Sequence, residues 1–311
     1  MPSQEPRIKT TVVGSYPVPD WLAAQPSEQG LVDATRVVLH TQEKAGLDVV
    51  CDGELYRFDV NHPETNGMIE YFIRPMAGVR TDITFDELVA YRDNAGMSFR
   101  SRPPGVVEGP LSCGALDLPG ACAMARRLAT RPLKFTVTGP HMLAKTLIDK
   151  HYGSLPALAQ GIAEALAEQV RHVDADVVQL DEANLPGHAE EWEWAAKAIN
   201  TVLDAVRGTP AVHLCFGNYG GQTVQKGTWD RLMQYLNSLH ADHIVMEMAH
   251  RDPKELEAFK DLRPEIGLGL GVVDIKRTEV ESADDIARGI ERAEKALGAG
   301  RVAYIHPDSG C

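Results

Sequence analysis

The stretch Asp176–Ala183 (DVVQLDEA) decides the fold class, because a short β-branched run ends here in two carboxylates. Seven similar runs lie before and after it, and longer stretches with apolar residues at intervals of three and four separate them. This alternation predicts an α/β fold, a (β/α)8 TIM barrel of eight parallel strands. The other runs are Thr10–Tyr16, Leu47–Glu54, Leu133–Pro140, Ala211–Asn218, His243–Ala249, Ile266–Asp274 and Arg301–Asp308.

Two features depart from a regular barrel. Residues 55–132 separate the second and third strands, and we expect a hairpin insertion there, with strands at Met68–Pro75 and Val106–Leu111 and a helix at Thr84–Asn94. Only Gly310 and Cys311 follow the HPDS segment, so the last helix is expected to be absent: either the chain is shortened, or a partner subunit or the N-terminal segment covers that face. Without a linker or repeat, residues 1–311 are expected to form a single domain.

Composition narrows the class of protein. The 31 basic and 44 acidic residues give a net charge of −13, which disfavours binding to nucleic acid or to anionic membranes. No apolar run approaches about 18 residues and the first residues do not resemble a signal peptide, so a cytoplasmic protein is expected. Five cysteines without regular spacing do not indicate a disulfide framework.

Polar side chains gather where the predicted strands end. Because the carboxyl ends of barrel strands form the active-site face, these side chains predict one site at the mouth of the barrel. A single such residue is usually a solvated carboxylate, whereas six strands ending this way favour a site. The residues are Ser15, Asp52, Glu54, Asp181, Glu182, His213, Cys215, Glu247, His306 and Asp308.

A metal site is predicted on the fifth and sixth strands. His213 and Cys215 are two residues apart, so both side chains project to one face of a strand, and Glu247 lies on the next strand. Alone, the His-x-Cys pair would indicate a buried histidine beside an inert thiol. The carboxylate of Glu247 within an apolar run requires a cation or donor partner, and the three together favour zinc.

The glycines of Gly267-Leu268-Gly269-Leu270-Gly271 lie inside a predicted strand with no helix start behind them. They therefore do not form a dinucleotide-binding motif. Glycines inside a strand more often permit close approach to the backbone, and we expect that use here.

The chain resembles the catalytic barrel of the cobalamin-independent methionine synthase family over residues 10–308. The metal-free decarboxylases of porphyrin synthesis share the barrel but lack the His-x-Cys and Glu set. Matching segments occur in the family's order: VVGSYP (12–17), DGE (52–54), MIEYF (68–72), FTVTGP (135–140), VVQLDEANL (177–185), AVHLCFGN (211–218), HIVMEM (243–248), GLGVVDIK (269–276) and HPDSG (306–310).

The resemblance implies a ligand set for Zn²⁺. His213, Cys215 and Glu247 match three of the family's ligands, but the cysteine of its PDCG motif is Ser309 here. A hydroxyl is a poor substitute for a thiolate. Cys311, two residues further on, is the predicted replacement; a three-ligand site with an open position and a deliberate serine are the alternatives.

The resemblance also implies a substrate site. Ser15, Glu54 and Asp181 match residues that bind the amino-acid part of homocysteine in that family. Lys276 stands where long-form members carry a histidine proposed as general acid, and Lys276 and Asp181 are the predicted catalytic residues. The implied reaction is a zinc-dependent S-methylation of a homocysteine-like thiol to methionine.

The features that hold the methyl donor in long-form members are different in this chain. The chain has one barrel, and Thr146 or its neighbours replace the tryptophan that stacks on the pterin, so a methylated corrinoid is favoured over folate. A corrinoid-protein partner and a homo-oligomer are both compatible with this. Two alternatives stay open: a related zinc-thiol alkyl transferase or lyase, such as an enzyme that opens an epoxide with a thiol, and a catalytically retired binding homologue.

Overall fold

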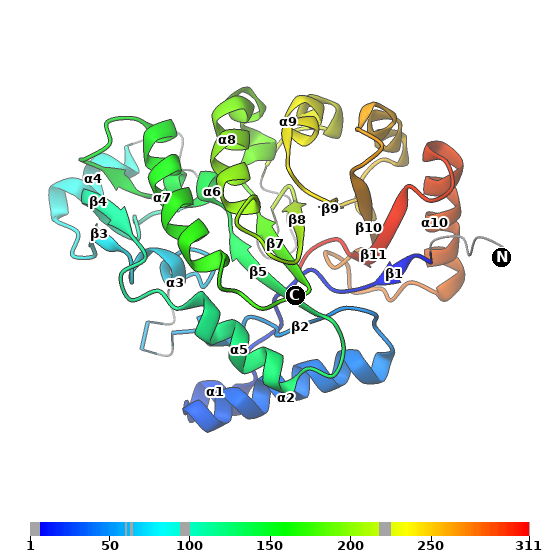
Figure 1. Cartoon of the computed structure of the whole chain (residues 1–311), viewed down its shortest axis with the longest axis horizontal. Helices are drawn as coiled ribbons and strands as arrows, with labels where there is room; N and C mark the ends of the chain where they lie inside the picture. Colours follow the sequence, from blue (N-terminus) through cyan, green and yellow to red (C-terminus); the bar gives the residue numbers. More distant parts are fainter. Residues whose placement is uncertain (1–6, 60, 63–64, 94–99, 218–224, 311) are drawn as a thin grey trace.

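The computed structural model describes residues 7–59, 61–62, 65–93, 100–217 and 225–310. Eight parallel strands curl around a centre, with helices on the outside (Figure 1). Their order is β1-β11-β10-β9-β8-β7-β5-β2, and each predicted strand run overlaps one of them. The bounds are Lys9–Thr10 (β1, starting one residue before its run), Val50–Cys51 (β2), Leu133–Thr138 (β5), Val177–Asp181 (β7), Thr209–Leu214 (β8), His243–Met246 (β9), Gly267–Val273 (β10) and Val302–Pro307 (β11).

Backbone hydrogen bonds between the two edge segments close the sheet. The carbonyl of Thr10 accepts from the amides of Asp48 and Val49, both at 3.1 Å, and the amide of Tyr16 donates to Gly53 at 3.0 Å. The Asp48 carboxylate adds a contact, because it accepts from the Thr10 amide at 2.9 Å. The predicted TIM barrel is therefore confirmed.

Helices cover the outer face of the barrel. Each serine before α2, α7 and α10 accepts a hydrogen bond from an amide of the first turn, which explains where these helices begin. The helices are Asp20–Ala24 (α1), Glu28–Ala45 (α2), Glu70–Ile73 (α3), Phe85–Arg92 (α4), Leu118–Leu128 (α5), Pro140–Thr146 (α6), Leu155–Val170 (α7), Trp192–Leu203 (α8), Met233–Ser238 (α9) and Ala283–Leu297 (α10). Single-turn or irregular 3₁₀ segments lie at Leu55–Arg57, Leu185–Gly187, Ala189–Glu191, Trp229–Leu232 and Pro253–Asp261.

Strand alternation separates two kinds of core. Outward residues such as Phe135 and Leu214 belong to the large apolar layer under the helices. The inward residues Val177, Ala211 and Val245 belong to a small apolar cluster that fills the barrel below the mouth. Above it, the inward residues become polar, which places ionisable groups at the carboxyl ends of the strands.

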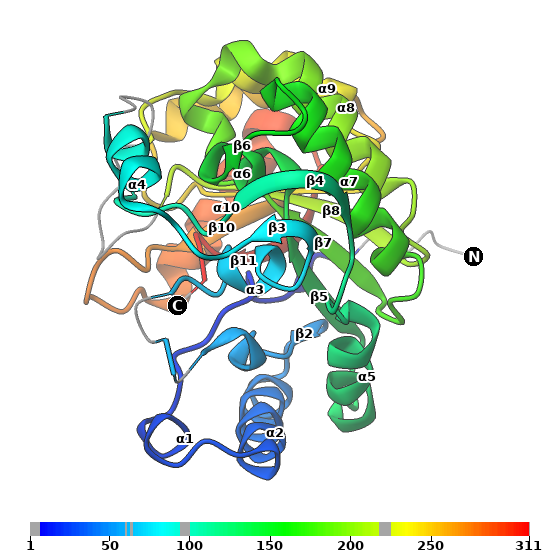
Figure 2. The same cartoon turned by 90° about the vertical axis from the view of Figure 1, so that its left-hand side faces the viewer.

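The insertion is built differently from its prediction. The Met68–Pro75 segment is not a strand, because its buried residues Ile69, Phe72 and Ile73 recur at helical spacing; Ile69 caps α3, and Phe72 and Ile73 lie on it. The strand that pairs antiparallel with β4 (Val106–Ser112) is instead β3 (Ala77–Arg80), and β6 (Ile148–Asp149) adds a third strand to this small sheet beside the barrel (Figure 2). The predicted helix near Thr84–Asn94 is confirmed as α4, which Thr84 caps.

Among the described residues, no helix has the length and apolar character required to cross a membrane.

Candidate functional site

The carboxyl ends of the strands surround a cavity of about 230 Å³. Ser15 and Glu54 approach it from the first two strands, and Asp181, His213 and Cys215 approach it from β7 and β8. The structure therefore places these five side chains around one cavity, and their roles stay predictions. The remaining lining residues are Val13, Asn66, Met68, Met142, Ala183, Gly217, Ser309 and Gly310.

Glu54 is held in an unusual conformation. Its φ of 62° lies in the left-handed region, which is uncommon for a residue with a side chain and typical of functional sites. Its Oε2 accepts from Arg57 Nη1 at 2.9 Å and its Oε1 accepts from Thr136 Oγ1 at 2.5 Å. A Cβ on Gly14 would collide with the Glu54 carboxylate, so the glycine of the Gly14-Ser15 pair makes room for it.

Asp181 faces the cavity from a buried polar network. Its Oδ1 accepts from Gln179 Nε2 at 2.8 Å, and Gln179 Oε1 accepts from Lys134 Nζ at 3.0 Å. Burial raises the pKa of Asp181 to about 7, and the nearby charge of Glu54 acts in the same direction. A cation bound in the cavity would therefore shift this carboxyl toward its ionised form.

His213 presents a nitrogen lone pair. Its Nδ1 lies 3.1 Å from the carbonyl oxygen of Val245, which can only accept, so Nδ1 carries the proton and Nε2 has the lone pair. Burial, together with the charge of His306, lowers the pKa of His213 to about 3. The imidazole is therefore neutral at neutral pH, which is the form that binds metals.

Cys215 is protonated in this environment. Burial raises the pKa of its thiol to about 12, and the carboxylate of Glu247 contributes. A thiol in such surroundings becomes a thiolate only when a metal or another cation compensates the charge.

Glu247 and Lys276 form a buried ion pair. Glu247 Oε1 lies 2.7 Å from Lys276 Nζ, and Oε2 accepts from the amide of Phe216 at 3.3 Å. Both side chains are almost completely buried, at 0% and 1% exposure. The buried carboxylate of Glu247 therefore has a cationic partner, as expected from the sequence. In this structure that partner is Lys276, in the loop after β10.

His213, Cys215 and Glu247 lie on neighbouring strands, but their ligand atoms do not form a compact group. Among the described residues, the His, Cys, Asp and Glu ligand atoms that lie within 4.8 Å of one another belong to a different set, His188, Glu190 and Glu191. The Lys145 ammonium already lies 2.9 Å from Glu191, so a cation is present beside that group. Cys311, the predicted fourth ligand, lies outside the described residues.

Several site residues were not predicted from the sequence. Arg57 is buried against the Phe72 ring and supports Glu54, while Lys134 and Gln179 form the network behind Asp181. A signal was present: Lys134 and Gln179 occupy inward positions of otherwise apolar strands, where a polar residue requires a partner.

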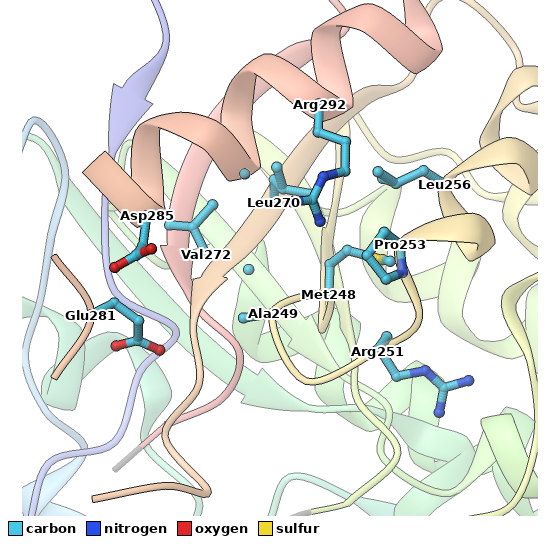
Figure 3. A pocket seen from close by; sticks show the side chains of 12 residues that line it. Met248, Ala249, Arg251, Pro253, Leu256, Leu270, Val272, Glu281, Asp285 and Arg292 are labelled. Atoms are coloured by element: carbon cyan, nitrogen blue, oxygen red, sulfur yellow. The ribbon is translucent and has the colours of Figure 1, made fainter. Parts of the chain in front are cut away.

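A second cavity, of about 190 Å³, lies outside the barrel between β10, α10 and the Pro253–Asp261 segment (Figure 3). The outward residues Leu270 and Val272 form part of its wall, and Arg292 and Asp285 lie on α10. None of the predicted catalytic, substrate or metal residues lines this cavity. The cavity inside the barrel mouth is therefore the candidate active site.

Comparison with known proteins identifies the family of this chain. Residues 8–311 match the family described as cobalamin-independent synthase, catalytic domain. Methionine synthases of Sulfurisphaera tokodaii and Thermococcus kodakarensis are each 27% identical; the alignments cover 98% of this chain and 86% and 87% of those proteins.

Solved structures of similar proteins show the same fold. A B12-independent methionine synthase from Shewanella, in complex with selenomethionine, superposes with a TM-score of 0.76 at 23% identity, covering 97% of this chain and 91% of that one. A putative vitamin-B12-independent methionine synthase from Listeria monocytogenes gives 0.71 at 16% identity, covering 99% and 92%.

The fold and the mouth of the barrel define an enzyme that transfers a methyl group to a thiol. The chain belongs to the cobalamin-independent methionine synthase family.

Proposed function

We propose that this chain is a zinc-dependent homocysteine S-methyltransferase that forms methionine. One observation carries the proposal: a single buried cavity joins an imidazole and a thiol on one side to the carboxylates of Asp181 and Glu54 on the other. These groups match the two ends of homocysteine, because the first pair suits a metal that binds sulfur and the second pair suits an ammonium group.

The residues at the mouth fit Zn²⁺ by the chemistry of their donor atoms. His213 offers a neutral imidazole fixed by the Val245 carbonyl, Cys215 offers a buried sulfur, and Glu247 offers a carboxylate. Nitrogen, sulfur and oxygen donors of this kind are typical zinc ligands. A bound zinc would supply one effect, the acidification of a coordinated thiol so that it is nucleophilic at neutral pH.

The remaining residues would orient the amino acid. Asp181 accepts a charged hydrogen bond from the ammonium group, and Glu54 adds a second carboxylate whose direction Arg57 and Thr136 fix. Ser15 lies at the same wall and binds the substrate carboxylate. Such fixed contacts hold the thiol in line with the methyl donor, which is the main contribution that positioning makes to catalysis.

Lys276 has a role in this proposal that follows from its ion pair. Its ammonium neutralises Glu247 within a buried environment. If the carboxylate held a metal instead, the Lys276 ammonium would be free at the mouth, where its positive charge would face the leaving corrinoid, which keeps the electron pair of the broken cobalt–carbon bond and needs no proton.

The donor that we propose is a methylated corrinoid, presented by a partner protein. Thr146, at the position of the pterin-stacking tryptophan, is fully buried and donates its hydroxyl hydrogen to the Leu143 carbonyl at 2.7 Å. It therefore offers no ring surface to a pterin. A free thiol substrate also suits a reducing compartment, and we propose the cytoplasm.

The test is a reconstituted reaction. Purified protein is analysed for zinc and then incubated with homocysteine and either methylcobalamin or methyltetrahydrofolate, and methionine is measured by mass spectrometry. About one zinc per chain, and methionine formation from methylcobalamin that is lost in Cys215→Ala, is the expected result. A protein that holds zinc and homocysteine but methylates it from neither donor would overturn the proposal and favour a different thiol reaction.

A further inference from the structure

We propose that His306 supplies the fourth protein ligand of the zinc site, in place of the cysteine that Ser309 replaces. The inference rests on the proposed zinc-dependent function and concerns which residue completes the metal site. Ser309 lines the cavity, but its hydroxyl is a weak zinc donor beside a thiol and an imidazole.

Strand register places His306 level with the other ligands. Gly271 of β10 pairs with His306 of β11, while Met246 of β9 pairs with both Leu214 of β8 and Leu270 of β10. The next residues along those strands are Cys215, Glu247 and Gly271, so four adjacent strands bring Cys215, Glu247, Gly271 and His306 to one level of the barrel.

Alternation along β11 directs the His306 side chain inward. Tyr304 belongs to the apolar cluster inside the barrel, and Ile305 packs against the outer core. His306 therefore faces the interior, where it is 2% exposed.

The glycines of β10 provide the space that the imidazole occupies. A Cβ on Gly269 would lie 3.0 Å from His306 Nε2, which is closer than side chains normally approach. The ring thus lies across the part of β10 that has no side chains, on the path from β11 toward the metal ligands of β9 and β8. This use fits the expectation that these glycines permit close approach.

Among the described residues, the donor nitrogen of His306 has only the Gly269 backbone, a weakly placed neighbour, to compensate its burial. Nδ1 lies 2.6 Å from the carbonyl oxygen of Pro307 and carries the proton, so Nε2 has the lone pair. Nε2 is buried and makes no well-formed hydrogen bond within the described residues, although the Gly269 backbone lies beside it. A buried lone pair of this kind costs free energy unless a cation or donor meets it.

The His306 ring also lies at the level of His213. His213 of β8 pairs with Val245 of β9, Val245 pairs with Gly269 of β10, and the His306 ring lies against Gly269. Two neutral imidazoles, the Cys215 sulfur and the Glu247 carboxylate make a four-ligand set. Because the Lys276 ammonium is bonded to Glu247 and the donors do not lie within 4.8 Å as a group, metal binding requires Glu247 to exchange Lys276 for the ion.

Zinc affinity of variants tests the assignment. Chelator competition is measured for the wild-type chain, His306→Gln, Cys311→Ser and His243→Gln, the last being a control that removes another buried imidazole of the barrel interior, one stacked on Tyr304. We expect His306→Gln to bind zinc at least ~100-fold more weakly, since even loss of groups that only orient a ligand costs about 10- to 100-fold. The Cys311→Ser and His243→Gln variants should stay within about threefold of the wild type.

Two measurements protect the test against a variant that misfolds. Zinc K-edge absorption of the wild-type protein without substrate should show one sulfur ligand, and two sulfurs would identify Cys311 and overturn the inference. Adding Ser309→Cys to His306→Gln should restore zinc affinity, because it returns the family's thiolate to the site.

The outcomes separate the two proposals. If the wild-type protein binds no zinc, the proposed function fails and this inference fails with it. If the wild-type protein binds zinc and forms methionine while His306→Gln keeps its zinc affinity, only the assignment of His306 is wrong.

Discussion

In the proposed site, Asp181 is the carboxylate assigned to the ammonium group of the amino acid. The substitution Asp181→Asn keeps its shape and removes its charge, and a charged hydrogen bond is worth about 1.5–3 kcal/mol. We expect homocysteine affinity to fall roughly 10- to 150-fold, measured by calorimetry, with the zinc content unchanged. Equal affinity in the variant at normal zinc occupancy would exclude homocysteine as the ligand of this site.

The buried carboxyl of Asp52 makes the stability of the protein depend on pH. Its Oδ1 accepts from the Glu54 amide at 2.9 Å, its Oδ2 is buried without a hydrogen bond, and burial raises the pKa of this carboxyl to about 6. The folded-state pKa lies above the ordinary value of 3.8, so the folded protein favours the protonated form of Asp52. The contribution of this form to the free energy of unfolding is fully present below pH 3.8 and is lost as the pH rises through 6.

Asp52→Asn should therefore gain stability relative to the wild type between pH 4 and pH 7, by on the order of 2–3 kcal/mol. The measurement is the free energy of urea unfolding at both pH values. A difference between the two proteins that stays constant over this range would show that Asp52 is ionised throughout.

For single residues, the sequence predicted which strand ends place polar side chains at the cavity, because a polar residue at the end of an apolar run seldom contributes to the core. It could not predict the partners. The Glu247–Lys276 pair joins residues of different strands, and the support of Glu54 by Arg57 depends on a left-handed residue that no spacing reveals. The zinc ligands and the catalytic roles stay predictions.

Among the elements, β10 and α10 use glycine in opposite ways. A Cβ on Gly271 would collide with Asp308 Oδ1, which accepts amide hydrogen bonds from Met248 and Ala249, while Oδ2 accepts one from His250. A Cβ on Gly289, in the middle of α10, would meet nothing within 4 Å. The first glycine is required by packing, whereas the second only weakens its helix.

Gly271→Ala should therefore destabilise the protein by about 1–3 kcal/mol, while Gly289→Ala should stabilise it by roughly 0.5–1 kcal/mol. Thermal unfolding of the two variants beside the wild type decides this, since the expected shifts in melting temperature have opposite signs. A rise for Gly271→Ala would mean that the Asp308 contacts are not needed.

The insertion shows why the elements were only partly predictable. The apolar run Met68–Pro75 is so short that its pattern fits both a strand and a helix. The core contacts of the buried Ile69 and Phe72 favour the helix α3. By contrast, α7 and α10 are long, begin at a capping serine and lie between strand runs, where the apolar spacing predicted helices.

For the whole molecule, closure of the barrel depends on a few groups beside β1 and β2. The Asp48 carboxylate accepts from both the amide and the hydroxyl of Thr10. Although burial acts in the other direction, these hydrogen bonds hold the pKa of Asp48 below its ordinary value of 3.8. Its stabilisation is thus present above pH 3.8 and lost as the pH falls through the folded-state pKa.

Asp48→Ala should lower the free energy of unfolding by about 1–3 kcal/mol at pH 7, because it leaves two donors unpaired. The deficit should be the same at pH 5 and should shrink below pH 3, as followed by urea unfolding. A deficit that persists undiminished at pH 2.5 would show that charge on Asp48 does not contribute.

The fold as a whole was predictable because eight strand runs separated by helical stretches have few parallel arrangements. That β1 begins one residue before its run and that Thr10 closes the sheet were not predictable, since both depend on how the curled ends meet.

The pairing of β1 with β11 has a consequence for how the molecule is made. Gly310 lies directly against the Ser15 hydroxyl, so residues translated some three hundred codons apart share one wall of the cavity. While a ribosome is still synthesising β11, its tunnel holds the segment that β1 must pair with. The cavity therefore cannot form until β11 has left the ribosomal tunnel, and until then a cell must protect an open sheet from aggregation.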